Sequence, residues 1–257
     1  MRATTQRNDG PTIAAIGLLA MCLVTFDHEA LGHGGACLAL HGRILALSSS
    51  VFRCDHISGL IDAAGPASNI LCGLVALALR MVTPLRAVRL RLFLILVTGF
   101  SFFWEGGYLM HAMHRQDGDL YSFAHWWLGS VSVEDRWIGA ALGLALYLLS
   151  VRLTARGLLT LFAEPPKARF VARIVWLSAA AGSTLAALVY AGSVAGDLRD
   201  AVLEIALASF PLLFIPLRAR RSAVDHPAAA IQRSYPAIIF ALTVYAVFVA
   251  TLGHGFA

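Results

Sequence analysis

Residues 28–33 read His-Glu-Ala-Leu-Gly-His, and their side chains have the most distinctive chemistry in this chain. Imidazoles and carboxylates are ligands of zinc, and a catalytic zinc site keeps one position open for water. The usual helical form of such a site, H-E-x-x-H, places two histidines four residues apart on one face, with the glutamate as general base. His28 and His33 are instead five residues apart, so on a regular α-helix they diverge by roughly 140°.

Two local arrangements are compatible with a metal site here. A π-turn inserted into the helix, a feature common at functional sites, brings His28 and His33 together with Glu29 beside the metal. Alternatively, Glu29 and His33, which are four residues apart, are the ligands and His28 lies behind them. The competing interpretation is a helix end that carries interfacial histidines without a metal.

Other polar motifs follow in the first half of the chain. Residues 63–69 read AAGPASN, and residues 103–113 read FWEGGYLMHAM. Two glycines beside Glu105 allow backbone to approach a carboxylate closely, as a third metal ligand requires. Residues 114–120, HRQDGDL, add Asp119 just beyond this segment.

These residues lie in a chain that is 58% hydrophobic and only 14% charged. Soluble domains carry about 25% charged residues, and the long uncharged runs indicate an all-α integral membrane protein with a bundle of six to seven transmembrane helices. We expect a retained first span rather than a cleaved signal peptide. The spans are expected at 12–36, 60–80, 90–113, 137–160, 171–194, 199–217 and 236–254.

The positions of the arginines orient this bundle. Lys and Arg gather before the first span and in alternate connections, which predicts a cytoplasmic N-terminus and an external C-terminus. With a rise of about 1.5 Å per residue and a hydrocarbon core of about 30 Å, His28, Asn69 and Glu105 all lie within roughly 6 to 13 Å of the outer face. Ionisable residues inside spans are costly and mark functional sites. We therefore expect the first three spans to form the core of the site.

The three motifs together resemble the site-2 protease family of intramembrane zinc metallopeptidases. That family has an H-E-x-x-H helix, a G-P-x-x-N element in the next core helix, and an aspartate followed by glycines in a third. The matching segments here, in the same order, are HEALGH at 28–33, GPASN at 65–69 and EGG at 105–107. The resemblance covers about residues 20–115, with Glu105 in the aspartate's place.

The resemblance implies an endopeptidase that hydrolyses a peptide bond in or near the membrane. Zinc is held by His28 and His33, with Glu105, or alternatively Asp119, as the third ligand, and Glu29 activates the bound water. The substrate-binding residues it implies are Gly65, Pro66 and Asn69. We expect His111 and His114 to support the ligands from behind. Residues 1–136 then form a metallopeptidase-like core, and residues 137–257 add helices of the same membrane domain.

Other functions remain open from the sequence. His28 with His33, and His111 with His114, imitate the histidine boxes of a di-iron membrane desaturase or hydroxylase. A catalytically inactive protease-like scaffold or a transporter is the non-enzyme alternative. The expected partners are the lipid bilayer and a membrane protein or peptide substrate, and no aromatic-basic patch suggests nucleic acid. A bacterial inner (plasma) membrane is the expected location.

Two further expectations concern the outer face. Cys37 and Cys54 flank the first outer loop, whereas Cys22 and Cys72 lie within spans, so we predict a disulfide between the first pair. The tryptophans of the chain's middle part resemble an interfacial aromatic belt. They are Trp104, Trp126, Trp127 and Trp137.

Overall fold

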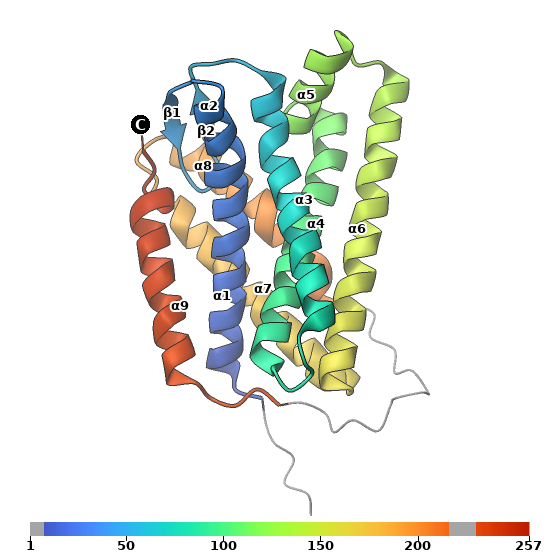
Figure 1. The fold of residues 1–257 in the computed structure, drawn as a ribbon, viewed down its shortest axis with the longest axis vertical. Coiled ribbons are helices and arrows are strands. Elements are labelled where there is room, and N and C mark those ends of the chain that lie inside the picture. The colour runs from blue at the N-terminus through green and yellow to red at the C-terminus, as the bar shows by residue number, and fades with distance from the viewer. Residues whose placement is uncertain (1–7, 216–229, 257) are drawn as a thin grey trace, which may run out of the picture.

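The computed structural model of the chain describes residues 8–215 and 230–256. Within them, six helices are long and apolar enough to cross a membrane. They are Gly10–Ala39, Gly59–Val82, Val88–Arg115, Val133–Phe162, Pro165–Ala187 and Tyr235–Gly253. The helices run side by side along the long axis of the molecule (Figure 1). The expectation of an all-helical membrane protein is thus met in its architecture.

The first of these helices is built from three segments. α1 (Gly10–Phe26) continues into the π-helical segment η1 (Asp27–Gly34) and then into α2 (Gly35–Ala39). The next spans are α3 (Gly59–Val82), α4 (Val88–Arg115), α6 (Val133–Phe162) and α7 (Pro165–Ala187). The last is α9 (Tyr235–Phe248), which ends in the π-helical η4 (Val249–Gly253).

Local sequence fixes where several helices begin. The Asp9 side chain accepts a hydrogen bond from the Thr12 backbone at the start of α1. Ser58, Ser132 and Ser234 cap α3, α6 and α9 in the same way. Such caps satisfy backbone N–H groups that have no partner within the helix.

The predicted span 199–217 is not one continuous helix in the part that the structure describes, which ends at residue 215. It is divided into α8 (Val194–Ala201), the π-helical η2 (Val202–Leu207) and a 3₁₀ turn, η3 (Phe210–Leu213). These pieces nevertheless run antiparallel to α7. Hydrogen bonds join Ser183 to the Ala201 carbonyl (3.2 Å), Trp176 to the Ala206 carbonyl (2.9 Å) and Arg173 to the Leu213 carbonyl (3.4 Å).

This broken segment preserves the expected alternation of the chain. Residues near the starts of α1 and α9 meet at one end of the bundle, where the Asp9 amide donates to the Ile231 carbonyl at 2.8 Å. At the opposite end, the Leu47 amide donates to the Phe256 carbonyl at 2.9 Å. The two ends of the described chain therefore lie at opposite ends of the bundle (Figure 1).

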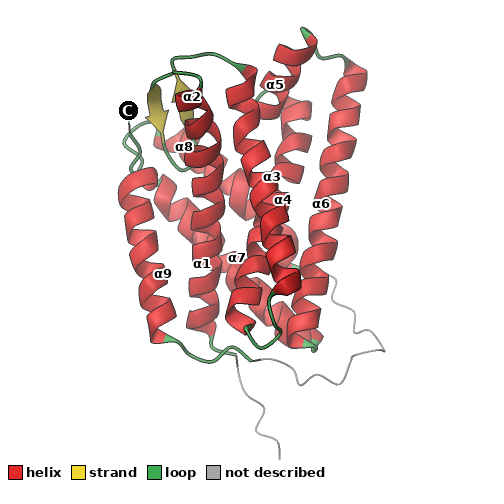
Figure 2. Ribbon diagram, viewed as in Figure 1, coloured by secondary structure: helices red, strands yellow, loops and turns green. Residues whose placement is uncertain are grey.

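A small hairpin covers the end of the bundle at which α2 finishes (Figure 2). β1 (Ile44–Leu47) pairs antiparallel with β2 (Phe52–Cys54). The predicted disulfide between Cys37 and Cys54 is present and joins β2 to α2. The short helix α5 (Asp119–Leu128) lies at the same end and has no buried residue.

Candidate metal centre

The π-helical segment η1 brings the two histidines of HEALGH together. The Nε2 atoms of His28 and His33 are 3.2 Å apart, and both side chains are buried. A π-helix has i→i+5 hydrogen bonding, so residues five apart lie above one another. The first of the two expected arrangements, a π-turn that unites the histidines, is therefore confirmed.

The other ring nitrogens fix the protonation of these imidazoles. His33 Nδ1 lies 2.7 Å from the Ile61 carbonyl oxygen, and His28 Nδ1 lies 3.0 Å from Glu105 Oε1. A carbonyl and a carboxylate only accept hydrogen bonds, so each Nδ1 carries a proton. In the neutral rings both Nε2 lone pairs then point at each other, an arrangement that a cation between them stabilises. Metal-ligating histidines usually donate their second N–H to such an acceptor.

Asp119 completes a group of three ligand atoms, all of which lie within 4.8 Å of one another. Its Oδ2 is 3.3 Å from His33 Nε2 and 3.6 Å from His28 Nε2. In a tetrahedral site with zinc–ligand bonds of about 2.0–2.1 Å, ligand atoms are about 3.3 Å apart. The donor set and its spacing thus fit one zinc-sized ion.

A tight turn delivers Asp119 to this position. After α4, Gln116 adopts a left-handed conformation (φ 59°) and Gly118 follows with φ 88°, which glycine accepts without strain. The Tyr108 hydroxyl accepts a hydrogen bond from the Asp119 amide at 3.3 Å. Burial raises the pKa of Asp119, but positive charge on the two facing imidazoles lowers it more, so the pKa lies below its usual value. A cation held between neutral rings would favour the ionised carboxylate in the same way.

Glu105, the first of our two expected third ligands, has a different place. Its Oε1 accepts hydrogen bonds from His28 Nδ1 and, at 2.7 Å, from Asn69 Nδ2. It thus faces the back of the His28 ring, away from the Nε2 atom that approaches Asp119. The geometry favours Asp119, the alternative, as the ligand. Glu105 and Asn69 orient His28, and these contacts confirm that the three motifs meet.

Trp104 also belongs to this site rather than to an aromatic belt. It is 1% exposed and stacks on His28 with ring centroids 4.4 Å apart. The belt prediction was therefore wrong for Trp104, because its face of α4 turns toward α1. Trp126, Trp127 and Trp137 are 49%, 70% and 73% exposed, as a belt requires.

The expected substrate-binding residues Gly65, Pro66 and Asn69 are all buried in α3. A Cβ on Gly65 would lie 2.2 Å from His33 Nε2, so this glycine makes room for the imidazole. Gly32 approaches α3 equally closely, since its Cβ would lie 2.6 Å from the Gly65 Cα. None of the expected three lines the cavity beside the metal centre. GPASN acts here as the packing surface behind the ligands.

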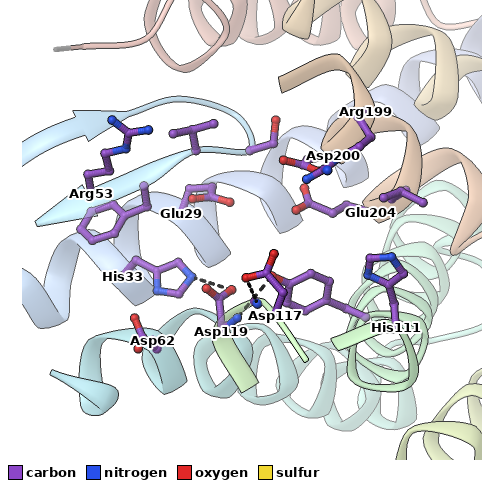
Figure 3. A pocket seen from close by; sticks show the side chains of 16 residues that line it. Glu29, His33, Arg53, Asp62, His111, Asp117, Asp119, Arg199, Asp200 and Glu204 are labelled. Carbon is purple, nitrogen blue, oxygen red and sulfur yellow. Dashed lines mark hydrogen bonds and ion pairs between the residues drawn. The ribbon is translucent and has the colours of Figure 1, made fainter. Parts of the chain in front are cut away.

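A cavity of about 450 Å³ opens beside the ligand atoms, and Glu29 and His33 line one wall (Figure 3). Glu29 is 3% exposed and has no hydrogen bond among the described residues.

His111 is exposed and lines the cavity, whereas His114 is exposed and outside its lining. No hydrogen bond or ion pair among the described residues joins either histidine to His28 or His33. The Nδ1 atoms of those two rings are held by Glu105 and the Ile61 carbonyl instead.

The residues of the opposite wall of the cavity were not predicted from the sequence. It comes from the broken segment after α7, through Arg199, Asp200, Leu203 and Glu204. One signal was available, because Asp200 and Glu204 stand in an otherwise apolar stretch that the sequence analysis interpreted only as a span.

Comparisons of the chain with protein-family models, with curated proteins and with solved structures find no match. Inferences about chemistry therefore depend on the geometry of the site itself.

Proposed function

We propose that this protein is a zinc-dependent membrane metallopeptidase. The observation that carries the proposal is the convergence of His28 Nε2, His33 Nε2 and Asp119 Oδ2 at zinc-ligand spacing on the edge of a cavity. Three protein ligands beside open space are the pattern of a catalytic rather than a structural zinc site. Bound zinc would lower the pKa of a water molecule and polarise the scissile carbonyl.

Glu29 is the proposed general base. It is adjacent to His28 in η1, lines the same cavity as His33, and has no competing partner among the described side chains. In the reaction its carboxylate accepts a proton from the attacking water and passes it to the leaving amine, as in general acid–base catalysis. Glu105, Asn69 and Trp104 keep His28 in its ligating orientation.

The cavity is lined in part by β2, whose Cys54 forms the disulfide with Cys37, so it lies at the end of the bundle that carries this disulfide. Disulfides persist in oxidising compartments, and the distribution of arginines favours a cytoplasmic location for the opposite end. The proposed location is the bacterial inner membrane, with the peptidase site near its outer face. The substrate is then a peptide segment at or just within that face.

The decisive experiment measures metal content and peptide cleavage for the full-length protein in lipid nanodiscs. Wild type should bind one zinc per chain and cleave members of a fluorogenic peptide library. Glu29→Gln should keep the zinc and lose about 10²-fold or more in kcat. His33→Ala should lose both.

His254→Ala serves as the control, because it removes an exposed histidine that belongs neither to the ligand group nor to the cavity lining. Its zinc content and its rate of peptide cleavage should equal those of wild type. Zinc without cleavage in wild type would point to an inactive scaffold, and absence of any metal to a scaffold or transporter. Two irons per chain would indicate an oxygenase. The structure gives that alternative no support, since the one metal-ligand group among the described residues does not include His111 or His114.

A further inference from the structure

The cavity beside the metal centre is strongly acidic. Six carboxylate side chains line it, against two arginines. The acids are Glu29, Asp62, Asp117, Asp119, Asp200 and Glu204, and the bases are Arg53 and Arg199. A cavity for purely apolar membrane segments would not need this lining, because an apolar ligand leaves buried carboxylates without partners.

Several of these charges are already matched within the protein. Arg199 forms an ion pair with Asp200 at 2.8 Å, and Asp119 faces the two imidazoles. Arg53 projects from the exposed side of β2. The remaining lining carboxylates have no ion pair to another described residue; they are Glu29, Asp62, Asp117 and Glu204.

Glu29 and Glu204 are the clearest unmatched pair. They come from η1 and η2, on opposite walls, and their carboxylates point toward one another across the cavity (Figure 3). Neither has a hydrogen bond or an ion pair to another described residue, although Glu29 is 3% exposed. Two facing carboxylates repel each other unless a cation lies nearby or one of them is protonated.

A second metal ion is a poorer match for this pair than an organic cation. In the described part of the chain, the one group of three or more His, Cys, Asp or Glu residues with converging ligand atoms is the His28–His33–Asp119 group. Glu204 is not a member of it. A cavity of about 450 Å³ has room for an amino-acid side chain.

We propose that Glu204 binds a positively charged group of the substrate, so that the enzyme selects peptides with an ammonium or guanidinium group close to the scissile bond. This inference rests on the proposed peptidase function and adds the substrate class. The cation has two possible sources, a Lys or Arg side chain or a free α-amino group, and both offer N–H donors to a carboxylate. Glu29 remains free to act on the water, since Glu204 holds the cation on the opposite wall.

The test compares matched peptides on wild type and Glu204→Gln in nanodiscs. One series carries a single Lys moved along a neutral, N-acetylated peptide, with acetyl-lysine at the same positions as the neutral twin. A second series has no Lys and a free or acetylated N-terminus. Wild type should prefer the charged member of one series by about 10- to 100-fold in kcat/KM, the range for a hydrogen bond to a charged group. The series that shows the preference identifies the source of the cation.

Glu204→Gln should lose this preference mainly through a higher KM for the charged peptide, and Glu204→Lys should reverse it toward an acidic peptide. Glu134→Gln is the matched control, because it removes one exposed carboxylate outside the cavity and should retain the full preference. Equal kcat/KM for charged and neutral twins on wild type, or an unchanged preference in Glu204→Gln, would overturn the inference.

A binding measurement separates this inference from the peptidase proposal. If wild type cleaves no peptide, the peptidase proposal fails, and isothermal titration with the lysine peptide and its acetyl-lysine twin still tests the cavity. Tighter binding of the lysine peptide that is lost in Glu204→Gln supports a cation site. Equal binding of the two peptides rejects it.

Discussion

At the residue scale, His28 is held on three sides. Trp104 stacks on its ring, Glu105 accepts from its Nδ1, and its Nε2 faces His33 and Asp119. Glu105 is itself held by Asn69. The ring orientation therefore depends on α3 and α4 as much as on η1.

Asn69→Ala should weaken zinc binding about 10- to 100-fold, the usual cost of losing a partner behind a metal ligand. Without the amide, the Glu105 carboxylate is free to rotate away from His28 Nδ1. Competition with a fluorescent zinc chelator measures the change. Ser150→Ala is the control, because it removes a buried hydrogen bond to Gly99 far from the histidines and should leave zinc affinity as in wild type.

Gly65 offers a test of the same site by steric means. A methyl group there would lie 2.2 Å from His33 Nε2, so Gly65→Ala must displace the imidazole. We expect zinc binding to fall about tenfold or more, as for loss of ligand orientation, while the helix content stays the same by circular dichroism. Gly35→Ala makes the same change where no atom lies within 4 Å. If both variants bound zinc equally well, the position assigned to His33 would be wrong.

At the element scale, the hairpin of β1 and β2 forms part of the cavity wall. Val51 and Phe52 line the cavity, and the Ser48 hydroxyl donates to buried Asp197 at 2.7 Å. The Cys37–Cys54 disulfide fixes the other end of β2 to α2. The hairpin is thus joined both to the helix that carries the two histidines and to the segment that carries Glu204.

The double variant Cys37→Ser/Cys54→Ser should destabilise this end of the molecule. Closing a loop of this length, with a sequence separation of 17, contributes about 3 kcal/mol in the chain-entropy view. We expect a lower melting temperature and faster hydrogen exchange over residues 40–58, with little change in α4 and α6. Cys22→Ser/Cys72→Ser alters the two free thiols and is the comparison. Uniform loss of protection along the chain would contradict a local role.

At the scale of the whole molecule, the distribution of the arginines and the proposed outward-facing site require the same orientation of the bundle in the membrane. The connection between α3 and α4 and the loops around α5 lie at opposite ends of the bundle (Figure 1). Reporter fusions should place the 115–136 connection outside and the 81–89 connection inside. The reverse result would put the cavity and the disulfide in the cytoplasm and would remove the basis for an outward-facing site.

The helices that follow the third span contribute residues to the site, and they do not simply pack against a complete core of three helices. The segment after α7 supplies Glu204 and Asp200 to the cavity, and Ser183 and Trp176 hold that segment along α7. A core confined to the first three spans therefore contains His28 and His33, but neither Asp119 nor the whole cavity lining.

The sequence by itself determined the membrane class and most of the spans, and it predicted the disulfide partners and, as one of two arrangements, the π-turn. Long apolar runs have few alternatives to membrane helices, and two histidines five residues apart meet only if the helix is locally widened. The meeting of His28, Asn69 and Glu105 followed from their equal depth. Each of these features depends either on residues close together in the chain or on the depth of a residue in the membrane, and both can be estimated from residue spacing.

Only the tertiary structure decided which carboxylate joins the histidines and what faces them. Glu105 and Asp119 lie at opposite sides of His28 because α4 ends in a left-handed turn at Gln116, which sends Asp119 back toward the ligands. Glu204 reaches the cavity because its segment packs along α7. Depth along the membrane normal could be read from spacing, but the rotation of each helix and the path of each turn depend on packing between segments far apart in the chain.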